Sequence, residues 1–189
     1  MNPRNVVVAI SGASGSIYGI RVLQILHQIE DVKSHLVITP SAKSTIGVET
    51  EYSVSEIEEL ADEVHSARDI GASIASGSFK TSGMIVAPCS IKTLSAIANS
   101  FGADLVSRAA DVTLKERRPL VLMVRETPFH IGHLRLMTKA TEIGAVIYPP
   151  IPAFYNNPKN LQDIVDHSVG RALDHLGIDV ANLKRWEGR

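Results

Sequence analysis

Short runs of consecutive apolar residues alternate with helical patterns along most of the chain. Each run is rich in β-branched residues or leucine and precedes a segment whose apolar residues recur at helical spacing. Continuous apolar runs are typical of parallel strands that helices cover on both faces. The expected pairs of strand and helix are 6–10 with 17–29, 35–39 with 42–49, 84–87 with 93–100, and 120–124 with 132–143, followed by a fifth strand at 145–148.

This alternation predicts an α/β fold with a doubly wound, mostly parallel sheet and helices on both faces. The length of 189 residues suits one domain over 1–189. Asn160 is placed to cap a C-terminal helix over 161–176, and a tail follows over 177–189. Segment 149–158 contains four prolines and cannot be a helix or a central strand, which makes it a candidate wall for a pocket.

Composition narrows the class of protein. The formal net charge is −1, with 19 basic and 20 acidic residues, so no nucleic-acid partner is indicated. Cys89 is the only cysteine, which excludes an intrachain disulfide and a thiolate metal cluster. The apolar runs are far shorter than the roughly 20 residues that span a bilayer. With no signal peptide visible, we expect a cytoplasmic protein without a membrane span.

A glycine-rich turn, Ser-Gly-Ala-Ser-Gly-Ser at 11–16, joins the first strand to the first helix. Gly12 and Gly15 let the backbone turn sharply and approach a ligand, and the following helix N-terminus carries about half a positive charge. Ser14 and Ser16 add hydroxyl donors. The turn matches neither a Walker loop nor the G-x-G-x-x-G fingerprint. It therefore predicts a phosphate site for a mononucleotide, with a tight turn capped by serines as the structural alternative.

A second turn of the same kind follows the third strand, at 87–93. Ser90 and Thr93 could bond a ligand there, although an ordinary helix cap explains them equally well. Cys89 lacks a nearby histidine or acid in the sequence, so we interpret it as a small buried residue rather than a nucleophile.

Cations are numerous in the second half of the chain. Arg125 and Glu126 follow an apolar strand at its carboxyl end, where α/β proteins bind ligands, and several cations meeting there would suit a phosphate dianion. Glu49 ends a predicted helix, where a carboxylate is mildly unfavourable, which hints at a function. His130 and His133 lack a third ligand at suitable spacing, so we expect surface or pocket-edge histidines and no metal.

Together these motifs resemble one family, the UbiX or Pad-type flavin prenyltransferases, over essentially the whole chain. The matching segments are Gly-Ala-Ser-Gly at 12–15, Glu-Thr at 49–50, Ala-Ser-Gly-Ser at 75–78, Pro-Cys-Ser at 88–90, Arg-Ala-Ala-Asp at 108–111, Leu-Lys-Glu-Arg-Arg-Pro-Leu at 114–120, Arg-Glu-Thr-Pro at 125–128 and Pro-Ala-Phe-Tyr at 152–155.

The resemblance implies a Rossmann-like fold in a homo-oligomer, with a dodecamer expected. It implies that the dimethylallyl group of dimethylallyl phosphate is joined to N5 and C6 of reduced FMN, and that the prenylated FMN serves UbiD-type decarboxylases, including the one in ubiquinone biosynthesis. The implied FMN-binding residues are Gly12, Ala13, Ser14, Thr39, Ser90, Ile91, Lys92, Thr93 and Arg125. The implied substrate-binding residues are Arg108, Lys115, Tyr155 and Arg171, and the implied catalytic residues are Ser14, Glu49, Lys115 and Glu126.

The chemistry of these side chains agrees with that activity. Arg108, Lys115 and Arg171 would stabilise the leaving phosphate, with Glu126 managing a phosphate proton. Glu49 with Ser14 would accept the proton lost on ring closure at C6. Two alternatives remain at this level: an FMN-dependent cysteine decarboxylase, which the Pro-Cys-Ser-Ile-Lys-Thr segment at 88–93 disfavours, and a flavodoxin-like electron carrier, which the near-neutral charge disfavours.

Overall fold

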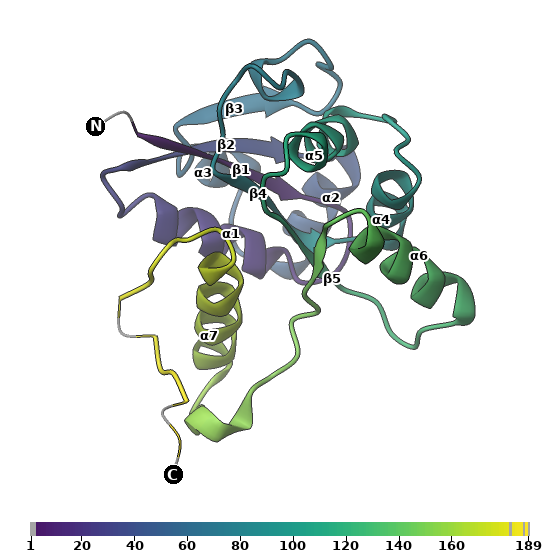
Figure 1. Ribbon diagram of the computed structural model, residues 1–189. Coiled ribbons are helices and arrows are strands. Elements are labelled where there is room, and N and C mark those ends of the chain that lie inside the picture. The colour runs from purple at the N-terminus through teal and green to yellow at the C-terminus, as the bar shows by residue number, and fades with distance from the viewer. Residues whose placement is uncertain (1–2, 182, 187, 189) are drawn as a thin grey trace.

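The strands form one parallel sheet (Figure 1). The computed structural model describes residues 3–181, 183–186 and 188, and within them the sheet has six strands in the order β3-β2-β1-β4-β5-β6, each pair parallel. The predicted doubly wound sheet is therefore confirmed. The strands are β1 (Arg4–Ile10), β2 (Val32–Ile38), β3 (Glu63–Ser66), β4 (Gly83–Cys89), β5 (Leu120–Val124) and β6 (Val146–Ile147).

Helices cover both faces of the sheet because successive side chains of a strand point to opposite sides. Val6 and Val8 join one buried cluster with α1, α2, α3 and α7, while Val7 and Ala9 join a second with α4, α5 and α6. None of the helices in the described part of the chain is long and apolar enough to cross a membrane. The helices are α1 (Ser16–Leu26), α2 (Pro40–Glu49), α3 (Val54–Glu58), α4 (Ile91–Ala98), α5 (Leu105–Lys115), α6 (Ile131–Glu142) and α7 (Leu161–Asp174), with 3₁₀ turns at Ser73–Ala75 and Phe154–Asn156.

The sequence predicts a helix over 54–61 from a capping box of Ser53 with Glu56, and α3 forms there but ends at Glu58. β3 and α5 were not predicted. β3 is a short edge strand with mostly exposed residues, so it lacks the apolar run of a buried strand. α5 begins after its Asp104 cap and buries apolar residues at helical spacing. This pattern was not used, because the prediction considered only the charges of this segment.

The C-terminal helix is shorter than expected. α7 begins after its Asn160 cap, as predicted, but ends at Asp174, two residues before the predicted end at 176. The amides of Leu176 and Gly177 bond carbonyls three residues back, which tightens the last turn beyond an α-helix. Within the predicted domain and tail, residues 1, 2, 182, 187 and 189 lie outside the described part of the chain.

The strand order reverses direction between β1 and β4. From β1 the chain crosses to β2 on one side, and later it returns to add β4 on the other side. The loops that leave the carboxyl ends of these two strands diverge, which opens a crevice where α/β proteins bind ligands. The glycine turn follows β1 and the Ser90 turn follows β4, so the fold brings both predicted turns to this switch point.

Candidate active site

A buried serine holds the two turns together. The Ser11 hydroxyl donates to the Pro88 carbonyl at 2.8 Å and accepts from the Ser90 amide at 2.8 Å. Ser11 is fully buried, so these bonds are protected from water. The sequence analysis did not single out Ser11, because its role depends on a strand 77 residues away.

The glycine turn needs its small residues. Gly15 has φ +97°, a left-handed conformation that side chains rarely adopt. A Cβ on Gly12 would lie 2.3 Å from the Ser41 hydroxyl oxygen. The Ser16 hydroxyl beside the turn is buried and has no hydrogen-bond partner within the described residues. A polar ligand atom would satisfy it, so the turn fits a ligand such as FMN.

Glu49 occupies the helix N-terminus that follows this turn. Its carboxylate accepts hydrogen bonds from the amides of Gly15 at 2.8 Å and Ser16 at 3.3 Å. Glu49 therefore ends α2, as predicted, but gains a favourable position at the positive end of α1. A phosphate cannot use the same two amides, so its expected place moves to residues 12–14 and the neighbouring turns.

The environment of Glu49 favours its charged form. Partial burial raises the pKa of Glu49, but hydrogen bonds from Ser14, Gly15 and Ser16 and the charge of Arg125 outweigh it and hold this pKa below its ordinary value. The Ser14 side chain is thus close to the Glu49 carboxylate, and the proton transfer expected between them stays a prediction. A lowered pKa keeps the carboxylate ionised at neutral pH but makes it a weaker base.

Arg125 lies in the same group of residues. Its amide bonds the Cys89 carbonyl at 3.0 Å, which ties the end of β5 to the end of β4. Burial raises the pKa of Tyr18, and the charge of Arg125 partly offsets this. Arg125 is therefore close to Tyr18 and Glu49, and an anion near the switch point would meet its guanidinium.

The remaining predicted FMN residues cap or begin helices at the same edge. Ser90 Oγ accepts from the Thr93 amide at 3.2 Å and donates to Thr93 Oγ1 at 3.1 Å. Thr39 accepts from the Ala42 amide at 3.2 Å. Ile91 and Lys92 form the first turn of α4 between Ser90 and Thr93, and Lys92 is exposed.

Cys89 is buried completely, and this burial raises the pKa of its thiol. The interpretation of Cys89 as a small buried residue is therefore confirmed.

Two predicted substrate-binding cations lie elsewhere. Arg108 and Lys115 belong to α5, which ends shortly before β5 begins at Leu120. Lys115 is thus near the amino ends of the strands, opposite to the glycine turn. Arg108 bonds Asp111 at 3.1 Å and Lys115 bonds Glu116, so each cation has a carboxylate partner in its own chain.

Tyr155 and Arg171 are grouped around α7, on the other face of the sheet. The Tyr155 hydroxyl lies 3.0 Å from His167 Nε2, one helical turn before Arg171. Burial raises the pKa of Tyr148, and both Arg171 and Tyr155 act on the same hydroxyl. The structure therefore brings Tyr155 and Arg171 together but separates them from Arg108 and Lys115.

Glu126 directly follows Arg125 at the carboxyl end of β5 and is partly buried. It accepts a hydrogen bond from the Thr127 amide at 2.9 Å. It is thus on the same edge as the glycine turn and separate from both groups of cations.

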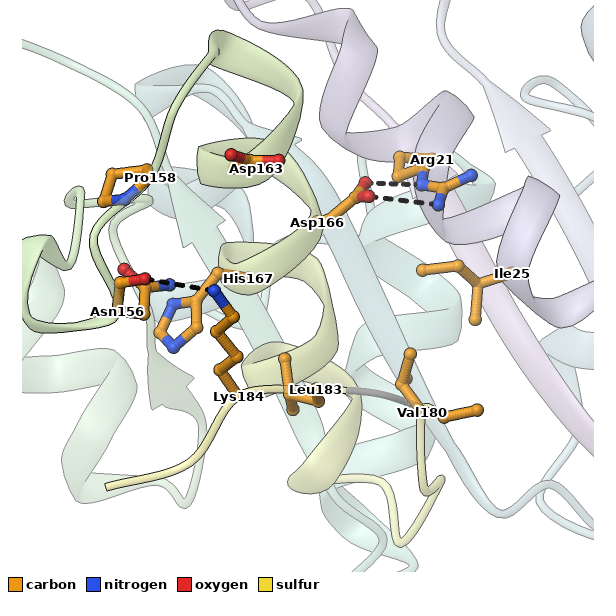
Figure 2. Close-up of a pocket in the computed structure, with 11 residues that line it drawn as sticks. Arg21, Ile25, Asn156, Pro158, Asp163, Asp166, His167, Val180, Leu183 and Lys184 are labelled. Atoms are coloured by element: carbon orange, nitrogen blue, oxygen red, sulfur yellow. Dashed lines mark hydrogen bonds and ion pairs between the residues drawn. The ribbon is translucent and has the colours of Figure 1, made fainter. Parts of the chain in front are cut away.

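A pocket of ≈ 370 Å³ lies between α1, α7 and the C-terminal segment (Figure 2). Arg21 of α1 and Asp166 of α7 form an ion pair of 2.7 Å at the wall of this pocket. His167 of α7 also lines the pocket. The pocket touches the Tyr155 group through His167 but does not reach the switch point.

Comparison with known proteins agrees with this geometry. Residues 1–173 match the model of the Flavoprotein family. The flavin prenyltransferase UbiX of Escherichia coli K12 is 56% identical over 187 residues, which cover 98% of this chain and 99% of that protein.

The chain belongs to the UbiX flavin prenyltransferase family.

Solved structures of UbiX proteins extend the match to three dimensions. AnUbiX (PadA1), in complex with FMN and dimethylallyl pyrophosphate, superimposes with a TM-score of 0.97 at 49% identity, covering 100% of both chains. A dodecameric, FMN-dependent UbiX-like decarboxylase from Escherichia coli O157:H7 gives 0.95 at 46% identity, covering 97% of this chain and 100% of the other. Membership of the UbiX family decides against the cysteine decarboxylase and electron-carrier alternatives.

Proposed function

We propose that this chain joins the dimethylallyl group of dimethylallyl phosphate to N5 and C6 of reduced FMN, with release of phosphate. The observation that carries the proposal is the pairing of the glycine turn with the Ser90 turn across the switch point, in a chain 56% identical to a flavin prenyltransferase. Reduced FMN supplies the nucleophilic atoms. The protein binds, orients and protects the reacting groups and moves protons.

FMN lies, in this proposal, along the carboxyl edge of the sheet. Gly12, Ala13 and Ser14 let the ligand approach the backbone, while Thr39 and the turn from Ser90 to Thr93, including Ile91 and Lys92, supply polar groups nearby. The Ser16 hydroxyl, which is unpaired within the described residues, and the guanidinium of Arg125 support this placement. The turn after β4 is also held in place, because the Ser90 amide donates to the Ser11 hydroxyl at 2.8 Å.

Departure of an allylic phosphate requires charges that stabilise the dianion. Arg108, Lys115 and Arg171 supply them, Tyr155 positions the substrate, and Glu126 holds a proton of the phosphate. Arginine suits this role because its fork of donors matches phosphate oxygens. Each of the three cations would exchange a neighbouring carboxylate, Asp111, Glu116 or Asp174, for the substrate.

One chain cannot assemble this set. Arg108 lies in the first turn of α5 and Lys115 at its last residue, both on one face of the sheet. Tyr155 and Arg171 lie by α7 on the opposite face, and the glycine turn lies at the carboxyl edge. We infer that several copies of the chain contribute to each pocket. The dodecamer of the E. coli relative supports a dodecameric assembly, in which heterologous contacts bring different faces together.

Ring closure at C6 releases a proton, and Glu49 is placed to accept it. The carboxylate is held between the Ser14 hydroxyl and the α1 amides, so it has a fixed orientation. Ser14 would relay the proton. The prenylated FMN then passes to a UbiD-type decarboxylase, as expected for the UbiX family in ubiquinone biosynthesis.

Anaerobic incubation with reduced FMN tests the activity. With dimethylallyl phosphate, mass spectrometry should detect a flavin heavier by one dimethylallyl group, and an equal amount of phosphate should appear. A parallel reaction with the pyrophosphate establishes which leaving group is preferred. An unchanged flavin mass with both donors, in protein that binds FMN, would refute the proposed function.

A further inference from the structure

A group of potential metal ligands lies away from the candidate active site, where β2 meets the edge strand β3. His35 is opposite Glu63 in the strand register, and His65 is opposite Val37. Because alternate residues of a strand share a face, Glu63 and His65 point to the same side of β3. The fold thus brings the His35 imidazole next to a carboxylate and an imidazole that are about 30 residues further along the chain.

The distances between ligand atoms fit one small cation. His35 Nδ1 lies 3.1 Å from His65 Nε2 and 3.5 Å from a Glu63 carboxylate oxygen, and His65 Nε2 lies 4.0 Å from that oxygen. Zinc binds histidine nitrogen at about 2.0–2.1 Å in tetrahedral geometry, which puts neighbouring ligand atoms about 3.3 Å apart. The three atoms need to move by only a fraction of an ångström to share one ion.

A neighbouring asparagine sets the tautomer of His35. Asn5 Nδ2 donates to the Lys80 carbonyl at 3.0 Å, which leaves Asn5 Oδ1 facing His35 Nε2 at 3.2 Å. An amide oxygen only accepts, so His35 Nε2 carries the proton and Nδ1 presents a lone pair toward His65. Metal-binding histidines are commonly oriented in this way by a partner on their other nitrogen.

The surroundings hold the His35 ring in place. His35 is 1% exposed, and Phe79 packs edge-on against its ring with 5.1 Å between centroids. Glu63 is half-exposed and leaves a route for an ion from solvent.

We propose that His35, Glu63 and His65 form a binding site for a zinc-type divalent cation, with water as the fourth ligand. Imidazole with one carboxylate suits zinc, copper or nickel rather than magnesium or calcium. β3 pairs only with β2 among the described strands, so the metal would fasten the edge of the sheet. This role is separate from the chemistry at the switch point.

Zinc binding to the full-length protein, stripped with a chelator and measured by competition with a chromophoric indicator, tests the site. We expect one zinc per chain and a higher melting temperature with zinc. His65→Ala should abolish both effects, and Glu63→Gln should weaken binding without unfolding the protein, because Glu63 is exposed. Asn5→Ala should weaken it by about 10–100-fold, as is typical when the outer partner of a ligand is lost.

A matched control uses the other histidine pair. The ring centroids of His130 and His133 lie 3.7 Å apart, so His133→Ala removes one imidazole of this pair without touching β3. This variant should bind zinc like the wild type. Wild-type protein that binds no zinc, or binding that survives His65→Ala and disappears in His133→Ala, would overturn the proposal and leave His35 and His65 as a hydrogen-bonded pair.

Discussion

Two regions of the molecule differ in whether one chain brings their residues together. They are the turns at the switch point and the cations predicted to bind the substrate phosphate. The two turns are joined within one chain by Ser11, and Glu49 completes them from α2. Arg108 and Lys115 are separated from Tyr155 and Arg171 by the whole sheet.

The difference follows from how each group is positioned. Residues at the carboxyl ends of adjacent parallel strands meet wherever the sheet forms. Cations on helices that cover opposite faces are kept apart by the sheet within one chain, and we propose that they meet across an interface between copies. In the proposed function, the first region is formed by the fold of one chain, and the second becomes a site only through assembly.

Glu49→Gln carries the largest expected effect, and it tests whether the switch-point region performs chemistry or only caps α1. General base catalysis contributes about 10²–10⁴ in rate, and a lowered pKa weakens a base, so we expect ring closure to slow by about 10²-fold. Phosphate release should continue. Rapid acid quenching, with NMR of the flavin at C6, separates the two steps.

The stability of the same variant gives an independent check. Because the folded-state pKa of Glu49 is lowered, its carboxylate stabilises the fold above the ordinary glutamate pKa, and this contribution is lost as pH falls through the folded value. The difference in unfolding free energy between wild type and Glu49→Gln should therefore shrink in acid.

Ser14→Ala should show a milder defect in ring closure than Glu49→Gln, since water can replace the Ser14 hydroxyl. Wild-type ring closure in Glu49→Gln would leave Glu49 with a capping role alone.

Lys115→Ala and Arg171→Ala test the proposal that different copies of the chain supply the cations of one pocket. Each should reduce phosphate release by about 10²–10³-fold, the usual cost of one stabilising donor, with FMN affinity unchanged. Co-expression of the two variants should restore part of the activity if one copy supplies Lys115 and another Arg171. Lys33→Ala removes an exposed cation and serves as the control. Failure of the mixed oligomer to regain activity would place both residues in one subunit's pocket.

Gly15→Val tests the conformation of the glycine turn. With φ at +97°, a β-branched residue is strained by about 1–3 kcal/mol, so both FMN affinity and stability should fall. Fluorescence quenching and urea unfolding measure the two effects. Gly47→Ala is the control, because a Cβ there meets nothing within 4 Å. Undiminished flavin binding in Gly15→Val would remove the turn from the site.

Ser16→Ala has the smallest expected effect on the protein without ligand. The hydroxyl is buried and unpaired within the described residues, so its removal should leave the melting temperature unchanged or raise it slightly. FMN affinity should nevertheless fall modestly, because the ligand loses a partner. Equal affinity in both proteins would show that the hydroxyl does not face the flavin.

Regular patterns made most of the fold predictable. The apolar runs identified five of the strands, and the Asn160 cap placed the start of α7. The edge strand β3 was not predicted because an edge strand needs few apolar residues. The proposed metal ligands were not predicted either, because His35 and His65 meet only through strand pairing. Sequence spacing pointed instead to His130 and His133.

The sequence by itself determined the parallel sheet, the positions of the two turns and the family, because strand and turn signals are local and the motifs lie in order along the chain. Only the tertiary structure decided that Glu49 caps α1 and that Ser11 joins the turns. It also separated Lys115 from Arg171. All three features depend on which surfaces come into contact. Contact between distant segments is fixed by packing and by strand order rather than by local sequence.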